Sequence, residues 1–462
     1  MTYSFTEKKR IRNNFGTRES ILKEPDLLSI QINSFNTFIQ EGEIEKKDVG
    51  LHSVFKSVFP ITALNGYAEI EYVDYELQEP KYKVNECKLR GVTYAATLQV
   101  KLNLVLFDKN GSTLKKKRRV KQVIEEHVYL GQLPLMTNTG TFVINGTERV
   151  VVSQLHRSPG VIFEHDKGKT HSSGKILFSS RIIPYRGSWL DFEFDHHEHL
   201  FVRIDRRRKL PVTALLRAMG MSTNEIIDTF FEHIGVKLKT KSCDLVIQPQ
   251  RLRGIIAEFD IMLGKDVVVE KGRRITAKHA NILENAGVNV ISAPLDYLLG
   301  KVIASDVVDT DTGEILLSSN AVITEESIEV LTTTKIKKIK IIYINDAENG
   351  IYISETLRLD EMQTEIEARM SIYHVMRPGE PATEDAVNSL FSNLFFKNDR
   401  YDLSRVGRMK LNRRLGINSE TGEHVLTHDD IIQVIKKLVD IKNGHDVVDD
   451  VDTLANRRVR AI

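Results

Sequence analysis

The sequence predicts an α+β protein built from several folded units. A chain of 462 residues is too long for a single hydrophobic core, so two or three units are expected. Apolar residues recur with helical spacing in some stretches and with the period of two typical of strands in others. Residues 231–347 also match themselves after a shift of 48 residues, which indicates an inserted, repeat-containing subdomain.

Composition restricts the class of protein. Lys and Arg total 65 and Asp and Glu total 63, so the net charge of +2 carries no bulk signature of nucleic-acid binding. No apolar run approaches the roughly 20 residues that cross a bilayer, and the first residues lack a signal-peptide apolar region. The two cysteines, Cys87 and Cys243, have no metal-ligand spacing, which disfavours a disulfide framework or a zinc site. We therefore expect a cytoplasmic protein.

The first 150 residues combine a helix with strands. Apolar residues from Leu28 to Ile39 recur at helical spacing directly after Pro25 and Asp26, which predicts a helix start. From Leu98 to Leu106 apolar and polar residues alternate, which predicts a half-buried strand, and turn residues follow over 108–111. This part of the chain is therefore predicted to be α+β.

A hairpin is predicted farther on, with one arm from Leu190 to Phe194 and the other from Leu200 to Ile204. Its acidic residues are expected on a solvated face. The tip between the arms, residues 195–199, contains three histidines and two carboxylates, which are ligand types of zinc and iron. We expect no metal site there, because a polar hairpin tip commonly carries such residues and no helical His pair supports the metal interpretation.

Residues 231–347, called the repeat module below, contain two copies of one pattern: strand, turn, Ile-Thr, short helix, strand. Ile275 and Thr276 of the first copy align with Ile323 and Thr324 of the second. Two similar copies can pack their apolar faces on each other, so we expect the module to be self-contained.

Two helices are predicted after the repeat module. Thr383 and Thr427 are good N-cap residues, and each is followed by acidic residues that favour a first helical turn. The apolar stripes that follow, from Val387 to Phe395 and from Ile431 to Val439, are typical of core-facing helices.

Three basic clusters are candidate phosphate contacts, although a solvated loop or strand face is the favoured interpretation of any single cluster. They are residues 115–119, 206–209 and 457–460.

The search for catalytic motifs fails. Gly168, Lys169 and Thr170 match the end of a phosphate-binding P-loop, but Phe163 occupies the position of its first glycine. No nucleophile elbow, dinucleotide fingerprint or compact aspartate cluster is found. We therefore assign no catalytic residue and no metal ligand to this chain.

Several longer stretches carry a family resemblance. They are residues 3–12, CKLRGVTYAA from Cys87, GTFVINGTERVVVSQLHRSPGVIF from Gly140, RIIPYRGSWLDFEFD from Arg181, VRIDRRRKLPVT from Val202, YISETLRLD from Tyr352, MRPGEP from Met376, residues 394–410 and NRRVR from Asn456. Through these stretches, in the family's order and over nearly its entire length, the chain resembles the amino-terminal part of the β subunit of bacterial multisubunit RNA polymerases. The repeat module is similar to an insertion found in only part of that family.

The resemblance implies a domain organisation. Residues 1–150 correspond to the first part of the protrusion, which residues 452–462 and sequence beyond them complete. Residues 151–451 correspond to the lobe, with the repeat module (231–347) inserted in it. The chain ends at Ile462 inside a basic stretch, and we expect it to be the amino-terminal part of a longer protein.

The resemblance also carries roles onto individual residues. It places Arg157, Trp189, Arg377, Arg400 and Asp452 at the DNA, near the non-template strand and the downstream edge of the transcription bubble.

The resemblance further assigns Arg149 and Gln154 to part of a rifamycin-binding pocket.

Other interpretations stay open for several of these residues. Arg149 and Arg157 suit a buried ion pair between strands. Trp189 suits core filling, although its setting favours a turn, where it could stack on a base. Asp452 suits a local backbone cap or an ion pair with Arg457 or Arg458.

The implied function is that of one jaw of the DNA cleft in a DNA-directed RNA polymerase, a nucleotidyltransferase that transcribes DNA into RNA from ribonucleoside triphosphates. The implied partners are DNA, RNA, the β′ and α subunits and a sigma factor, near the nucleoid. Magnesium is expected in the complete enzyme, held by β′, and no cofactor is expected in this chain, which alone should be inactive. The alternatives are a free-standing DNA-binding or architectural protein made of jaw-like domains and, more remotely, an enzyme that uses the histidine cluster.

Overall fold

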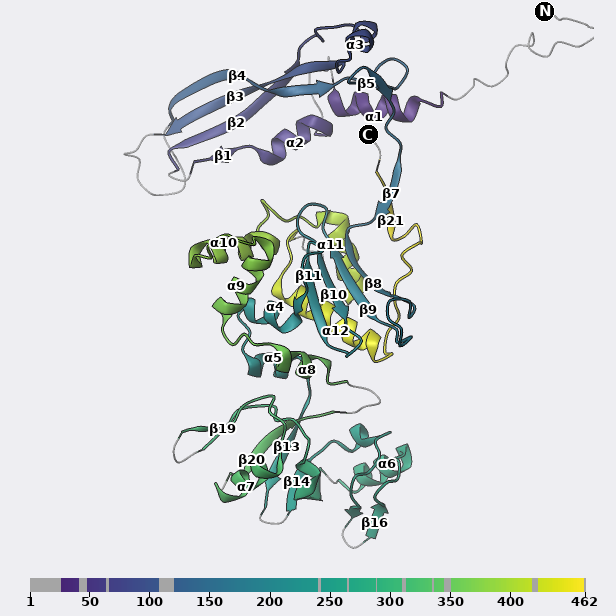
Figure 1. Ribbon diagram of the computed structural model, residues 1–462, viewed down its shortest axis with the longest axis vertical. Helices are drawn as coiled ribbons and strands as arrows, with labels where there is room; N and C mark the ends of the chain where they lie inside the picture. Colours follow the sequence, from purple (N-terminus) through teal and green to yellow (C-terminus); the bar gives the residue numbers. More distant parts are fainter. Residues whose placement is uncertain are drawn as a thin grey trace, which may run out of the picture. The chain divides into compact units, whose positions relative to one another are not determined.

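The chain forms two compact units. The computed structural model describes residues 26–40, 48–63, 66–107, 120–239, 242–263, 266–287, 289–309, 313–334, 336–344, 350–417 and 423–460. The first unit contains residues 1–156 and 459–462, and the second contains residues 157–458. Helices and strands occur in both (Figure 1), which confirms the predicted α+β, multidomain class. The basic cluster at 115–119, the turn at 108–111 and the family stretch at 3–12 lie outside the described residues.

The first unit is built on an antiparallel sheet with the strand order β1-β2-β3-β4. Helix α1 begins at Ser29 and buries Phe35 and Ile39, which confirms the helix predicted after Pro25 and Asp26. The predicted alternating strand is β3. The elements are α1 (Ser29–Ile39), α2 (Gly50–Val58), β1 (Ile61–Thr62), β2 (Ala68–Leu77), α3 (Val84–Arg90), β3 (Ala95–Phe107), β4 (Val120–Pro134), β5 (Phe142–Ile144) and β6 (Thr147–Arg149).

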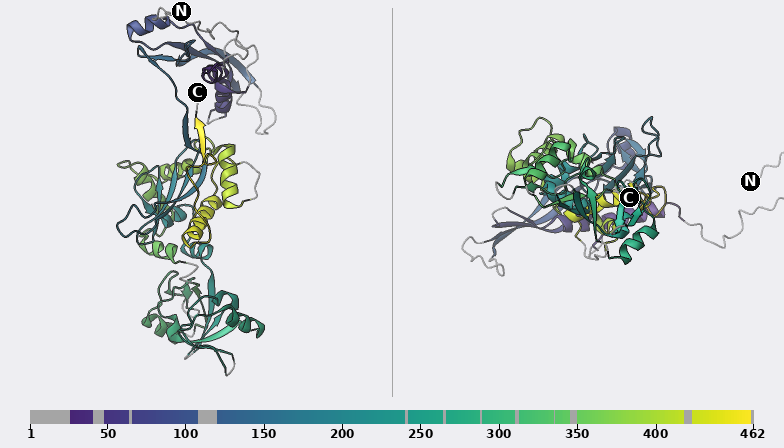
Figure 2. Two further views of the ribbon diagram at one scale, coloured as in Figure 1. Left: turned by 90° about the vertical axis from the view of Figure 1, so that its right-hand side faces the viewer. Right: turned by 90° about the horizontal axis from the view of Figure 1, so that it is seen from below.

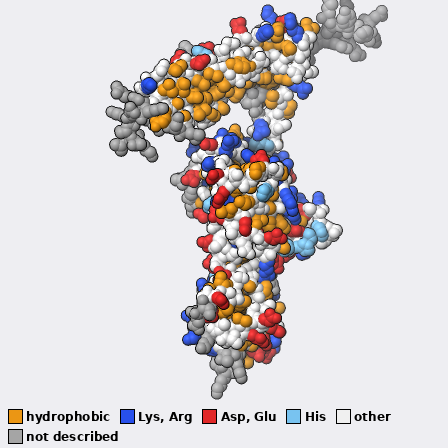
Figure 3. Space-filling view, turned by 60° about the vertical axis from the view of Figure 1, so that its left-hand side comes forward, with side chains coloured by type: hydrophobic (Ala, Val, Ile, Leu, Met, Phe, Trp, Pro, Cys, Tyr) orange, Lys and Arg blue, Asp and Glu red, His pale blue; other side chains and the backbone are white. Residues whose placement is uncertain are grey.

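One region of this unit leaves large apolar side chains uncovered. Strand β4 exposes Val123, Tyr129 and Leu130. Figure 3 shows hydrophobic side chains gathered over the unit that carries this sheet. An apolar surface of this kind is typical of a face that contacts other protein.

The second unit contains an antiparallel five-stranded sheet with the order β12-β11-β10-β9-β8. Figure 2 shows helices α11 and α12 lying along it, and these helices contact β8 and β9 respectively. The elements are β8 (Gly160–His165), β9 (Phe178–Ile183), β10 (Leu190–Phe194), β11 (Leu200–Ile204), β12 (Leu210–Pro211), α4 (Val212–Ala218), α5 (Thr223–Phe230), α8 (Tyr352–Leu359), α9 (Glu365–Met376), α10 (Glu384–Phe395), α11 (Ser404–Leu415) and α12 (His428–Lys442).

The predicted hairpin is formed by β10 and β11, with Leu190 opposite Ile204 and Phe194 opposite Leu200. The expectation of a solvated acidic face is wrong for Asp191, which is buried. Arg181 lies opposite it on β9 and donates from Nε to its Oδ1 over 2.7 Å. The guanidinium neutralises the carboxylate, which allows an acidic residue to occupy a central strand.

Both helices predicted after the repeat module are confirmed. Helix α10 follows Thr383 and α12 follows Thr427, whose hydroxyl accepts the Asp430 N–H. Their predicted apolar stripes pack in the core next to the five-stranded sheet.

The repeat module has its own sheet, with the order β17-β14-β13-β20, and its own buried cluster. Helix α6 follows Thr276 and α7 follows Thr324, the two threonines that the sequence shift aligns. The elements are β13 (His233–Leu238), β14 (Ser242–Val246), η2 (Pro249–Leu252), β15 (Ile261–Leu263), β16 (Asp266–Val269), α6 (Ala277–Asn285), β17 (Val290–Pro294), η3 (Leu295–Leu298), β18 (Val307–Val308), β19 (Ile315–Leu317), α7 (Glu325–Thr333) and β20 (Lys338–Ile342).

The module is nevertheless not fully self-contained, contrary to the expectation from sequence. Val302, Ala304 and Ile342 belong to the buried cluster of the five-stranded sheet. In addition, Asn320 Nδ2 donates to the carbonyl oxygen of Ser354 on α8 over 2.9 Å, and both residues are buried. The module therefore shares part of its packing with the rest of the second unit.

The chain passes twice between the two units. Strands β7 (Gln154–Arg157) and β21 (Arg457–Arg460) contain these passages and pair in a two-stranded sheet. The predicted domain limits at 150 and 451 lie a few residues before the unit boundaries at 156 and 458, and the assignment of the units as protrusion and lobe stays a prediction.

Candidate functional site

Trp189 stands at the start of β10 and is only half-buried. Its backbone N–H donates to Asp205 Oδ1 over 2.7 Å, and the N–H of Asp205 donates back to the Trp189 carbonyl. Two guanidinium groups flank the indole: that of Arg206 lies 5.0 Å from the ring centroid and that of Arg181 lies 5.8 Å from it. Trp189 is not among the residues of the buried cluster of this unit, which favours the turn interpretation over core filling.

The turn before Trp189 is joined to the segment that contains Arg400. The N–H groups of Tyr185 and Arg186 both donate to the carbonyl oxygen of Asp402, and the N–H of Asp402 donates to Arg186. A Cβ at Gly187 would lie 2.7 Å from Cδ2 of Tyr401, so only glycine allows this approach. The structure thus brings the predicted residues Trp189 and Arg400 into one region, although 211 positions separate them in the sequence.

Arg157 belongs to an ion-pair network that leads towards Trp189. Its guanidinium contacts both carboxylate oxygens of Glu164, at 3.4 and 3.2 Å. Glu164 also lies 3.6 Å from Arg181, which in turn bonds to Asp191 and flanks Trp189. The ion-pair interpretation of Arg157 is therefore correct, but the pair is partly exposed rather than buried.

Asp452 and Arg377 make local ion pairs. Asp452 bonds to Arg457 over 2.5 Å, which agrees with the alternative raised from sequence, yet 83% of its side chain remains exposed. Arg377 ends helix α9 and contacts Glu380 over 3.1 Å; this hydrogen bond and charge raise the pKa of the already cationic guanidinium. No contact in the described part of the chain joins either residue to Trp189.

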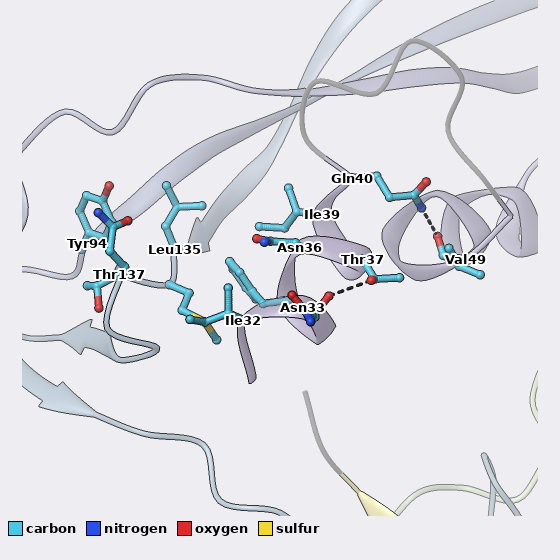
Figure 4. A pocket seen from close by; sticks show the side chains of 13 residues that line it. Ile32, Asn33, Asn36, Thr37, Ile39, Gln40, Val49, Tyr94, Leu135 and Thr137 are labelled. Carbon is cyan, nitrogen blue, oxygen red and sulfur yellow. Dashed lines mark hydrogen bonds between the residues drawn. The ribbon is translucent and has the colours of Figure 1, made fainter. Parts of the chain in front are cut away.

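In the first unit, Arg149 and Gln154 are both exposed. Within the described residues Arg149 has no ion-pair partner, so the interpretation of Arg149 as part of a buried pair is wrong. A cavity of about 770 Å³ lies beside α1 (Figure 4), and the figure shows Thr37 bonded to the Asn33 carbonyl at its wall. Neither Arg149 nor Gln154 lines this cavity.

The loop that matches the end of a P-loop binds a carboxylate of its own chain. Asp166 accepts hydrogen bonds from the N–H groups of Gly168, Thr170 and Leu177. Desolvation raises the pKa of Asp166, but these donors outweigh it and lower the pKa to about 2. The amides that a phosphate would need are therefore already occupied.

The histidine rings of the hairpin tip are tilted against one another: those of His196 and His197 lie 3.8 Å apart at 45°, and those of His197 and His199 lie 5.9 Å apart at 40°. The His196 ring also stacks nearly parallel, at 4.6 Å, on that of His171, which lies between β8 and β9. In the described ranges, no group of three or more His, Cys, Asp or Glu side chains is arranged to hold a metal ion.

Sequence reasoning missed Glu164, Asp205 and the role of Arg181. The ion pairs of Arg181 depend on the register of β8, β9 and β10, where it faces Ile162 on one side and Asp191 on the other. The sequence did indicate Arg206 as a candidate phosphate contact, because it begins the basic cluster at 206–209. No local pattern, however, indicates that its guanidinium lies beside Trp189.

A partly buried indole lies beside two guanidinium groups, an arrangement suited to unpaired bases and phosphates. The family model described as RNA polymerase beta subunit matches residues 26–409. The chain therefore belongs to the RNA polymerase β-subunit family, as the resemblance implied. None of the helices in the described ranges has both the length and the apolarity that a membrane span requires.

Proposed function

We propose that this chain forms one jaw of the DNA cleft in a DNA-directed RNA polymerase and contacts the non-template strand and downstream DNA during transcription. Membership of the β-subunit family supports the enzyme class. The DNA-facing residues of the proposal are Arg157, Trp189, Arg377, Arg400 and Asp452.

The observation that carries the proposal is the setting of Trp189. The residue is partly buried, its backbone is held by Asp205, and its indole is flanked by Arg206 and Arg181. An aromatic face stacks on any base, while nearby guanidinium groups attract phosphates. Arg400 is exposed and supplies a third cation in the same region, because backbone hydrogen bonds hold its segment against the Trp189 turn.

The rest of the proposal concerns the assembled enzyme. The partners are the β′ and α subunits, a sigma factor, DNA and RNA, in the cytoplasm near the nucleoid. Magnesium is held by β′, so the chain alone gives no template-dependent RNA synthesis. The first unit forms part of the protrusion and the second forms the lobe. Arg149 and Gln154 contribute to a rifamycin pocket, a role that their exposure permits.

The test uses a complete polymerase that contains this sequence. Loss of stacking in Trp189→Ala removes roughly 1–3 kcal/mol, so the lifetime of the open promoter complex should fall roughly 5- to 150-fold. Trp189→Phe keeps an aromatic face and should restore most of the lifetime. Equal lifetimes for Trp189→Ala and the parent enzyme would contradict the proposal.

Asp452 separates base recognition from a structural role. A carboxylate only accepts hydrogen bonds, so it favours a base that presents donors, such as the Watson–Crick edge of guanine. Asp452→Ala should therefore flatten the dependence of open-complex lifetime on one non-template base. If the ion pair with Arg457 is its whole role, Arg457→Ala and Asp452→Ala will shorten the lifetime equally for all four bases.

A further inference from the structure

A second basic surface lies in the repeat module, away from the residues considered above. It is a groove of about 850 Å³ between strands β13 and β20 and the segment 305–308. Four lysines line it: Lys237, Lys337, Lys338 and Lys340. We call it the lysine groove.

The lysines are crowded in a way that costs stability. Lys237 and Lys338 lie directly opposite each other on adjacent strands, and like charges in such a pair repel. Lys340 follows on the same face, because alternate residues of a strand share a face, and the intervening Ile339 is buried. Opposite Lys340 stands Gly235, which has no side chain to fill the groove.

These charges are not neutralised locally. Within the described residues, none of the four ammonium groups has an ion pair or a hydrogen bond. Among the described residues that line the groove, Asp306 is the one carboxylate, and it already accepts hydrogen bonds from Asn224 and from the Ser319 N–H. Asp244 stands directly opposite Lys237 on β14, but its carboxylate is paired with Lys239 over 2.7 Å.

The fold itself does not require lysines here. Strand β17 occupies the position in the first copy of the repeat that β20 occupies in the second. At the positions of Lys338 and Lys340 it carries Val290 and Ser292. An exposed strand of this type therefore forms without cations, and the lysines of β20 need another explanation.

We propose that the lysine groove binds the phosphate backbone of double-stranded DNA, independently of base sequence. Duplex DNA carries one negative charge per about 1.7 Å of its axis, which suits three cations on two neighbouring strands and a fourth, Lys337, directly before β20. The chain belongs to the RNA polymerase β-subunit family, and the choice of duplex DNA as the anionic polymer rests on the function proposed above. This contact lies outside the jaw residues proposed above and gives the repeat module a DNA-binding role of its own.

The test compares two variants of the whole chain with equal charge loss. One is the double substitution Lys338→Gln with Lys340→Gln in the groove. The control is Lys271→Gln with Lys278→Gln, which removes two exposed lysines of the same module outside the groove. Fluorescence anisotropy with a labelled short duplex, over a series of salt concentrations, gives the slope of log affinity against log salt.

Each lost phosphate contact makes the slope less steep by about 0.9, so the groove variant should lose about 1.8 and the control should lose almost nothing. Lys338→Arg with Lys340→Arg, which keeps both charges, should retain the parent slope. Because it relieves repulsion with Lys237, the groove variant should also unfold at an equal or higher denaturant concentration. A lower midpoint would mean that the lysines are structural and would overturn the proposal.

Further outcomes distinguish the rival explanations. An unchanged slope in the groove variant, with a less steep slope in Arg400→Gln, would overturn the lysine-groove proposal and leave the jaw function standing. A less steep slope in the groove variant, with an unchanged slope in Arg400→Gln, would support the lysine groove and count against the phosphate contact proposed for Arg400. If the groove lysines are needed to bind a glutamate-rich peptide but not to bind duplex DNA, the surface serves an acidic protein partner and the DNA proposal is wrong.

Discussion

Substitution of Gly187 by alanine tests the close approach that brings Trp189 and Arg400 together. Gly187 has a φ of +127°, a conformation that residues with a Cβ rarely adopt. Its new Cβ would lie 2.7 Å from Cδ2 of Tyr401 and 3.2 Å from the carbonyl oxygen of Arg400. The ring of Tyr401 is fully buried, so it has little room to move.

The expected cost has two parts. The unfavourable backbone conformation costs about 1–2 kcal/mol, and forcing an extra methyl group into a packed region costs about 1–3 kcal/mol. Gly187→Ala should therefore lower the free energy of unfolding by about 2–5 kcal/mol. Gly379 is the matched control, because its φ is +88° and no atom lies within 4 Å of a Cβ built there. Gly379→Ala should cost only the backbone part.

Chemical denaturation followed by intrinsic fluorescence can measure the free energy of unfolding of both variants. Trp189 is the chain's single tryptophan and lies two residues after Gly187. Alanine restricts the unfolded chain equally in both variants, so that effect cancels in the comparison. Equal destabilisation by the two substitutions would refute the packing argument, and a shift of less than about 0.5 kcal/mol in Gly187→Ala would refute the strained conformation as well.

Two further predictions follow from the fold. Deletion of residues 231–347 should lower the free energy of unfolding of the second unit by about 3–6 kcal/mol, since Val302 and Ile342 leave its core; denaturation monitored at Trp189 would show this, and unchanged stability would show that the core closes without them. The pKa of Asp166 falls from 3.8 to about 2 on folding, so its contribution to stability is present above about pH 4 and is lost as the pH falls through about 2. Asp166→Asn should remove this part of the acid dependence, and identical acid-unfolding profiles for variant and parent would contradict it.

Local elements were predictable because their signals are local. The start of α12 follows from Thr427 and the acidic residues after it, and the β10–β11 hairpin follows from alternation on either side of a polar tip. The solvated position predicted for Asp191 was wrong for a reason that alternation cannot reveal. Strand β10 is central in its sheet, and Arg181 on the neighbouring strand neutralises the carboxylate.

The repeat module shows the same limit at a larger scale. A shift of the sequence reveals two similar stretches, and α6 and α7 start at the aligned threonines. Self-similarity does not report which residues pack outside the repeat. Asn320 and Ile342 belong to the second copy. Asn320 nevertheless bonds to Ser354 on α8, and Ile342 is part of the buried cluster of the five-stranded sheet.

The sequence by itself determined the family, the α+β class and the residues that carry the resemblance, because these depend on residue identity and on spacing over a few turns or strands. Only the tertiary structure decided that Arg181 and Arg206 flank Trp189, that the Trp189 turn meets the segment of Arg400, and that Lys237 faces Lys338. The physical reason is that such contacts depend on strand register and on close packing between distant segments, and a shift of register by one residue would move each side chain to the opposite face.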